Sequence, residues 1–272
     1  MKILDGRELA GFIQERQASQ VRALRQAWKV FPKLAIIITG DDPVIDTYVR
    51  LKQSYGEDIL IDVEIHKIDQ ATLLSTIDTL NNDETVHGII IQLPLVDPSQ
   101  TDEAVNAINP AKDVDGLGEQ AVHTPATAMA ISWLLAGYNV ELRDKNIAIV
   151  GNGRLVGAPL AKLWATSGYA VTVYDDQTEN LASAIRAAHI IVTATGVPGL
   201  ITSQMIQPSA VVVDAGTSSE HGKIVGDVSA DVREREDLTI TPEKGGVGPL
   251  TVTALFDNVI LAAKTVAEAQ KN

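Results

Sequence analysis

A chain of 272 residues, 45% hydrophobic and 21% charged, can bury one large core or two medium ones, and we expect two domains. Cysteine is absent, which excludes disulfides, thiolate metal sites and cysteine nucleophiles. The formal net charge of −13, with no basic patch, argues against nucleic acid or an anionic membrane as a partner.

Small-molecule chemistry in the cytoplasm is the expectation that remains. No apolar run approaches the roughly 20 residues that span a bilayer. The N-terminal segment turns polar soon after Met1, unlike a secretory signal. The five histidines lie far apart and form no His-x-x-x-His pair, so we expect no metal site.

The first half of the chain alternates helical and strand-like segments. Residues 5–28 carry apolar side chains at a mostly helical spacing and predict a helix that ends near Pro32. Short β-branched runs follow, each with a helix-length segment after it. The strands are expected at 34–39, 61–65 and 88–92, and the helices at 43–55, 72–81 and 99–108. This alternation predicts a parallel sheet with helices on both faces.

The same alternation restarts after Lys145. Strands are expected at 147–150, 170–174, 190–194, 210–214 and 238–241, and helices at 156–167, 180–187 and 251–269. A helix at 127–136 is expected to bridge from the first unit into this one. The last helix follows a glycine cluster and is expected to pack back on the first domain. The predicted fold class is therefore α/β with two domains and a cleft between them. The expected boundaries are residues 1–118 plus 251–272 for the first domain and 119–250 for a Rossmann-type second domain.

A glycine-rich turn follows the buried strand at 147–150. It places glycine at 151, 153 and 157, where the strand passes into a helix. Such a turn lets the backbone approach a pyrophosphate and directs the N–H groups of the helix N-terminus at the phosphates. The sequence therefore predicts a dinucleotide site. The residues expected to hold the cofactor here are Gly151, Asn152, Gly153, Arg154, Leu155, Val156 and Gly157.

Two acidic residues, Asp175 and Asp176, end the next strand. They stand about 20 residues beyond the glycine turn, where dinucleotide folds place a carboxylate that accepts the ribose hydroxyls. A 2′-phosphate would be repelled there, so NAD is favoured over NADP. The alternative is that both residues simply open a solvated turn.

A second turn of small residues spans 193–199 and contains Thr195 and Gly196. It also follows an apolar strand, and its glycines could admit the ribose and nicotinamide side of the cofactor. An ordinary tight turn is an equally good interpretation of these residues alone.

Tyr48 and Lys52 lie four residues apart on the helix expected after Pro43, so both project from one face. A tyrosine can lie flat against a conjugated ring, and a lysine withdrawn from water has a lowered pKa and can transfer protons near neutral pH. Read alone, the pair is more often a helix surface with a lysine that reaches for solvent.

Four motifs occur in the order and spacing of one enzyme family: TYVRLK at 47–52, IIIQLPLVDP at 89–98, KDVDG at 112–116 and GGVGPLT at 245–251. With them the chain resembles the bifunctional methylenetetrahydrofolate dehydrogenase/cyclohydrolase family over nearly its whole length. The resemblance implies oxidation of 5,10-methylenetetrahydrofolate by hydride transfer to NAD or NADP. Hydrolysis of the methenyl product to 10-formyltetrahydrofolate then follows.

The resemblance also implies roles for individual residues. Lys52 matches the family's catalytic lysine, and Gln92 matches the glutamine that hydrogen-bonds it. Asp115 matches the aspartate that accepts hydrogen bonds from the pterin, while Asp113 is expected to be structural. Tyr48 matches the residue that stacks on the folate. Further substrate contacts are expected from Leu93, Pro94, Gly246, Gly248 and Pro249. A cytoplasmic homodimer that binds tetrahydrofolate derivatives and serves purine biosynthesis is the corresponding expectation.

The chain departs from the family pattern at several places. Ile45 stands where the family usually has serine, and Pro242-Glu243-Lys244 replaces Pro-Val-Pro ahead of the glycine cluster. The usual Arg-Ser of the cofactor loop is Asn152-Gly153, which again favours NAD because a phosphate needs cations or donors. The alternatives are a dehydrogenase without cyclohydrolase activity, a shikimate-dehydrogenase-like reductase and a non-catalytic nucleotide sensor.

Overall fold

The computed structural model describes residues 1–41, 43–220 and 223–270, and the chain forms two compact units. Gly11–Ala126 and the residues from Val252 onwards form the three-stranded unit. Met1–Ala10 and Thr127–Thr251 form the six-stranded unit. The predicted two-domain α/β fold is thereby confirmed.

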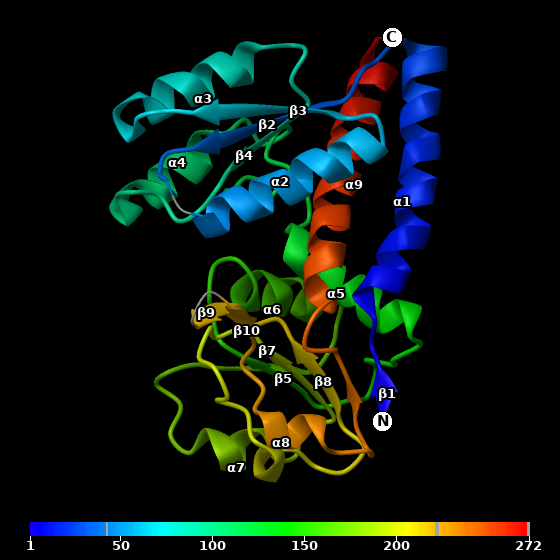
Figure 1. Cartoon of the computed structure of the whole chain (residues 1–272), viewed down its shortest axis with the longest axis vertical. Helices are drawn as coiled ribbons and strands as arrows, with labels where there is room; N and C mark the ends of the chain where they lie inside the picture. The colour runs from blue at the N-terminus through cyan, green and yellow to red at the C-terminus, as the bar shows by residue number, and fades with distance from the viewer. Residues whose placement is uncertain (42, 221–222, 271–272) are drawn as a thin grey trace. The chain divides into compact units, whose positions relative to one another are not determined.

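The three-stranded unit is built on a parallel sheet of order β3-β2-β4 (Figure 1). Its strands are β2 (Lys33–Ile38), β3 (Asp62–Lys67) and β4 (Gly88–Ile91). Its helices are most of α1 (Gly6–Ala23), a π-helical turn (Leu24–Trp28), α2 (Pro43–Asp58), α3 (Leu73–Asn82) and α4 (Thr101–Ala107), with 3₁₀ turns at Gln70–Thr72 and Pro98–Gln100. Each was expected from the hydrophobic pattern within a few residues, except for the short π and 3₁₀ turns.

The core of this unit explains why β2 and β4 read as continuous apolar runs. Ala35 and Ile37 of β2, with Ile89 and Ile91 of β4, pack against α3 and α4. The residues between them on the strands are buried as well, because helices cover the opposite face. A strand buried on both faces shows no alternation of apolar and polar residues.

The six-stranded unit has the order β1-β11-β8-β7-β5-β6, with all its strands parallel. Of these strands, Figure 1 labels β1, β5, β7 and β8. The strands are β1 (Lys2–Ile3), β5 (Ile147–Val150), β6 (Val171–Tyr174), β7 (Ile190–Thr193), β8 (Val211–Asp214) and β11 (Thr239–Ile240). The helices are α5 (Ala126–Gly137), α6 (Gly157–Thr166), α7 (Leu181–Ile185) and α8 (Ala230–Arg233), and a 3₁₀ turn lies at Ser203–Met205. β6 and β7 flank β5 on opposite sides, so the strand order reverses at β5, where α/β folds bind ligands.

The predicted domain boundaries differ from this division at the N-terminus. Residues 1–10 belong to the six-stranded unit, not to the unit that carries Lys52. The reason is that β1 pairs with β11, with Lys2 opposite Thr239. Residues 119–126 also group with the three-stranded unit. The sequence pattern also missed the antiparallel pair β9 (Ser218–Glu220) and β10 (Lys223–Val225), and the four-residue helix α8.

The last helix, α9 (Val247–Ala269), begins four residues earlier than predicted. Pro249 lies in its first turn, where a missing N–H removes no helical hydrogen bond. From Val252 onwards α9 packs in the three-stranded unit, as expected. The Tyr55 and Phe256 rings lie 5.1 Å apart, and Gln17 Nε2 donates to the Thr253 carbonyl at 2.9 Å. By length and composition α9 could cross a bilayer, but 61% of its most apolar window is buried, as in a core helix.

Candidate active site

Lys52 and Gln92 form a direct hydrogen bond in the three-stranded unit. Lys52 Nζ, from α2, donates to Gln92 Oε1 at 2.6 Å. Gln92 directly follows β4, and its backbone N–H donates to the Ile37 carbonyl at 2.9 Å, which continues the β2–β4 ladder by one residue. The glutamine is therefore held on the sheet while its amide oxygen receives the amine. An amide can orient the lysine without adding a charge that would raise the lysine's pKa.

Asp115 acts on the same amine through its charge. Burial lowers the pKa of Lys52, and the carboxylate of Asp115 partly opposes this by raising it. Burial likewise raises the pKa of Asp115, and the charge of Lys52 opposes that shift. Desolvation is the larger effect on both groups. The site thus holds a lysine with a pKa below its usual range, as proton transfer near neutral pH requires.

Tyr48 lies one helical turn before Lys52 on α2 and is half-buried. Burial raises the pKa of its phenol, so the side chain stays neutral. Ile45, which stands where the family usually has serine, is only 6% exposed. At this position the chain packs an apolar side chain in place of a hydroxyl.

The turn that carries Asp115 is fixed by two residues. The buried Asp113 accepts hydrogen bonds from the backbone N–H groups of Gly116 at 3.0 Å and Gly118 at 2.8 Å. This arrangement agrees with the structural role expected for it. Asn258 of α9 donates from Nδ2 to the carbonyls of Val114 at 2.8 Å and Thr124 at 2.9 Å. Sequence reasoning missed Asn258, which no local motif distinguishes from other polar residues of a long helix.

The other predicted substrate contacts are divided between the units. Leu93 and Pro94 follow Gln92 directly; Leu93 is partly buried and packs against the core that β2 and β4 form with α3 and α4, and Pro94 is exposed. Gly246, Gly248 and Pro249 belong to the six-stranded unit. There the Gly245 carbonyl accepts the Gly6 N–H at 2.9 Å, and a Cβ added at Gly6 would overlap the Gly246 carbonyl. The glycine cluster therefore also has a packing role.

The predicted dinucleotide turn lies at the carboxyl end of β5. Gly151 has a φ of 103°, a left-handed conformation that favours glycine, and its N–H donates to the Tyr174 carbonyl at 2.7 Å. A Cβ at Gly157, the first residue of α6, would overlap the Gly151 carbonyl. A Cβ at Gly153 would meet nothing within 4 Å, so the turn leaves open space beside it. The exposed residues 152–155 and the helix N-terminus fit a bound pyrophosphate.

The other predicted cofactor residues lie at the same edge of the sheet. Val150 pairs with Tyr174 and with Thr193, so the turns after β5, β6 and β7 are neighbours. Asp175 and Asp176 are exposed, and Asp175 Oδ1 accepts the Gln177 N–H at 3.1 Å. A Cβ at Gly151 would lie 2.5 Å from the Ala194 carbonyl oxygen, so the turn with Thr195 and Gly196 lies against the glycine turn. The structure brings the predicted cofactor residues together at the switch point of the sheet.

Known proteins resemble both units. Residues 4–115 match the tetrahydrofolate dehydrogenase/cyclohydrolase catalytic domain. Residues 125–267 match the NAD(P)-binding domain of the same family. The bifunctional protein FolD of Amoebophilus asiaticus is 40% identical over 285 residues, which cover 96% of this chain and 96% of that protein.

Solved structures resemble the chain over almost its full length. The bifunctional methylenetetrahydrofolate dehydrogenase/cyclohydrolase from Campylobacter jejuni matches with a TM-score of 0.92 at 34% identity, over 98% of this chain and 99% of that chain. A Trypanosoma brucei methylenetetrahydrofolate dehydrogenase-cyclohydrolase complexed with NADP and an inhibitor matches with a TM-score of 0.90 at 33% identity, over 97% of each chain. These matches decide against the shikimate-dehydrogenase alternative. The chain belongs to the tetrahydrofolate dehydrogenase/cyclohydrolase family.

Proposed function

We propose that the chain catalyses both reactions of its family, with Lys52 as the proton-transfer group of the second. It oxidises 5,10-methylenetetrahydrofolate to the methenyl compound with a nicotinamide dinucleotide and hydrolyses that product to 10-formyltetrahydrofolate. The main support for this proposal is the 2.6 Å hydrogen bond between Lys52 Nζ and Gln92 Oε1. Burial also lowers the pKa of the Lys52 amine. A dehydrogenase without cyclohydrolase activity would not need this pair.

In the oxidation the protein chiefly positions and shields the reactants. Tyr48 offers its ring as a stacking surface for the folate, and Asp115 offers a carboxylate to the pterin N–H groups. The bound dinucleotide supplies the hydride acceptor, held by the turns after β5, β6 and β7. Hydride transfer between two carbons needs alignment and exclusion of water more than an acid or a base.

In the hydrolysis Lys52 Nζ accepts or returns the proton that moves as water adds to the methenyl carbon. Gln92 Oε1 holds the amine in a fixed direction, and Asp115 sets how readily it takes up a proton. The purified protein should therefore form reduced dinucleotide from methylenetetrahydrofolate and should also consume methenyltetrahydrofolate without any dinucleotide. The absorbance of the reduced dinucleotide and of methenyltetrahydrofolate follows the two reactions. If methenyltetrahydrofolate is not consumed, the chain has dehydrogenase activity alone.

The pH dependence of the hydrolysis should move in opposite directions in two variants. Asp115→Asn removes the charge that raises the pKa of Lys52, so the limb of the kcat profile that reports this lysine should move to lower pH. Gln92→Glu adds a charge beside Nζ and should move the limb to higher pH. Each shift should be on the order of one pH unit. The test is to measure kcat for the hydrolysis against pH at saturating folate in the native chain and both variants. If the limb lies at the same pH in all three, Lys52 does not determine the pH dependence.

We also propose that NAD is preferred over NADP, because Asp175 and Asp176 are exposed carboxylates at the end of β6. Asp175→Ser keeps a side-chain acceptor for the Gln177 N–H and removes the charge. The ratio of kcat/KM for NADP to that for NAD should rise about tenfold. Asp176→Ser, measured in parallel, shows which of the two carboxylates discriminates between NAD and NADP. An unchanged ratio in both variants and in the double variant would defeat the specificity argument.

The remaining proposals concern the setting of the enzyme. We propose a homodimer in the cytoplasm that binds tetrahydrofolate derivatives and supplies one-carbon units to purine biosynthesis. The formal net charge of −13 supports the absence of a nucleic acid or anionic membrane partner. Light scattering of the purified chain tests the dimer, and a monomer mass at micromolar concentration would contradict it.

A further inference from the structure

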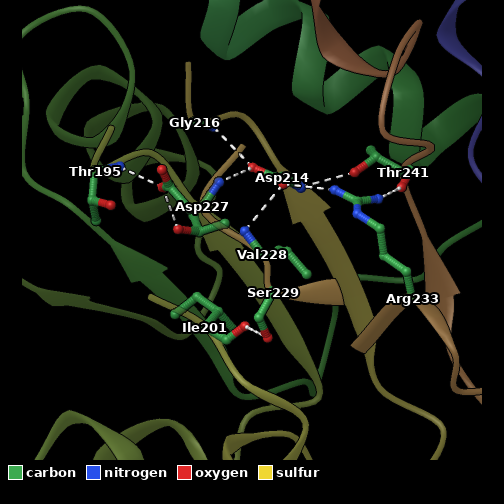
Figure 2. A network of polar contacts seen from close by, with 10 residues as sticks. Thr195, Ile201, Asp214, Gly216, Asp227, Val228, Ser229, Arg233 and Thr241 are labelled. Carbon is green, nitrogen blue, oxygen red and sulfur yellow. Dashed lines mark hydrogen bonds and ion pairs between the residues drawn. The ribbon is translucent and has the colours of Figure 1, made fainter. Parts of the chain in front are cut away.

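A buried network of polar groups lies at the carboxyl edge of the six-stranded sheet (Figure 2). At its centre is Asp227, which is 1% exposed and lies between β10 and α8. One of its oxygens, Oδ2, accepts two hydrogen bonds: from Thr193 Oγ1 at 2.6 Å and from the Thr195 N–H at 2.7 Å. A single carboxylate therefore holds both ends of the short connection between β7 and the turn that follows it.

Asp227 is in turn held by Asp214, the last residue of β8. The carboxylate of Asp214 accepts the backbone N–H groups of Asp227 at 3.0 Å and Val228 at 3.3 Å. Arg233 Nη2 forms an ion pair with it at 2.9 Å, and Arg233 Nη1 donates to the Thr241 carbonyl at 3.0 Å. The Asp214 side chain is 4% exposed, so these charge-assisted bonds are shielded from water. The position of Asp227 thus depends on the carboxyl ends of β8 and β11.

The space around both carboxylates requires glycine. A Cβ added at Gly216 would overlap the carboxylate of Asp227, and one added at Gly226 would overlap the carboxylate of Asp214. At both places the glycine backbone lies against the carboxylate, so a larger residue there would displace it. Within the described residues, Asp227 Oδ1 is buried and has no hydrogen-bond partner. A buried polar atom without a partner calls for an explanation in a native protein.

The turn that Asp227 holds forms part of the predicted cofactor site. Thr195 Oγ1 accepts the Val197 N–H at 3.1 Å, which closes the turn over Gly196, whose φ is 69°. Ala194 and Thr195 lie directly against Gly151 of the pyrophosphate turn. A shift of the Thr193–Gly196 backbone would therefore change the space that the turns after β5 and β7 leave for a dinucleotide.

We propose that Asp227 is a positioning residue for dinucleotide binding. Its carboxylate holds the Thr193–Gly196 turn in the position in which the turn can contact the ribose and nicotinamide side of the cofactor. This inference rests on the proposed cofactor site. It predicts a defect confined to dinucleotide binding, because Lys52 and Gln92 belong to the other unit and the hydrolysis uses no dinucleotide.

Three variants test the inference. Asp227→Ala leaves the Thr193 hydroxyl and the Thr195 N–H without their acceptor and should raise the KM for NAD about tenfold or more. Asp227→Asn keeps one acceptor oxygen without its charge and should raise this KM about threefold. Thr193→Val removes one donor and keeps the shape of the side chain, so a smaller rise in the same direction is expected. The KM for folate and the turnover of methenyltetrahydrofolate should stay at the native values in all three.

Asp237→Asn is the matched control. Asp237 also accepts a backbone N–H, from Ser209 at 3.1 Å, and pairs with Arg235, but it lies at the amino ends of β8 and β11. This variant should leave the KM for NAD unchanged. A fall of both activities together in the Asp227 variants, in step with their thermal midpoints, would overturn the inference, as would an unchanged KM for NAD in Asp227→Asn and Thr193→Val.

Calorimetric titration with NAD separates this inference from the proposed function. If the native chain binds no dinucleotide, the proposed cofactor site fails together with the inference. If the native chain binds NAD and the Asp227 variants bind it equally well, only the positioning role is overturned. If the native chain binds NAD and the Asp227 variants bind it more weakly, the result supports both the proposed cofactor site and the positioning role of Asp227.

Discussion

Replacing Lys52 with methionine should reduce the hydrolysis of methenyltetrahydrofolate by about 10²- to 10⁴-fold, the range that a positioned acid or base contributes. Methionine has a similar length but cannot move a proton, and Gln92 Oε1 would lose its donor. Folate binding should remain measurable, since Tyr48 and Asp115 are unchanged. Native turnover in this variant would remove Lys52 from the mechanism.

The same variant should be at least as stable as the native chain. Burial holds the pKa of Lys52 below its ordinary value of 10.5, so the unfolded chain binds this proton more tightly than the folded chain. The charged amine therefore costs stability below its folded-state pKa, and this cost disappears as the pH rises from that value towards 10.5. Thermal midpoints at neutral pH test this. Lys67→Met, on the exposed side of β3, is the control that should leave the hydrolysis unchanged.

Gly157→Ala should raise the KM for the dinucleotide on the order of a hundredfold, because the added Cβ overlaps the Gly151 carbonyl and forces α6 away from the glycine turn. The hydrolysis, which needs no dinucleotide, should keep most of its native rate. A native KM for the dinucleotide in this variant would contradict the proposed binding turn.

Two further alanine variants separate the possible causes of such a defect. A Cβ at Gly153 meets nothing within 4 Å, so Gly153→Ala should fold normally and lose affinity only if the ligand occupies that space. Gly11→Ala lies in the three-stranded unit, where a Cβ likewise meets nothing within 4 Å. It should leave both activities unchanged and stabilise α1 by about 0.5–1 kcal/mol.

The buried parallel strands could be predicted almost to the residue. The expected strand at 147–150 is β5, and those at 190–194 and 210–214 end within one residue of β7 and β8. These segments are buried on both faces, so burial alone selects continuous valine and isoleucine. A cofactor role could also be predicted for the residues that follow them, because glycine after β5 and aspartate after β6 occupy places that dinucleotide folds use.

Short elements that depend on distant partners could not be predicted. β1 has two exposed residues, and it is a strand only because β11, more than two hundred residues later in the chain, offers an open edge. The start of α9 at Val247 was missed because its first turn contains glycine and proline, which usually indicate a loop. In both cases tertiary contacts outweigh the local preference of the residues.

The sequence by itself determined the fold class and the family, because these follow from apolar periodicity and from motifs that stand in order along the chain. Through the family resemblance it also predicted site roles for Lys52, Gln92 and Asp115. Only the tertiary structure decided which groups hold the predicted site residues in place: Asn258 holds the turn before Asp115, and Asp227 with Asp214 holds the Thr195 turn. A hydrogen bond requires two atoms to meet at about 3 Å. For these partners, 13 to 144 residues apart, no local pattern encodes that meeting, and packing of the complete units creates it.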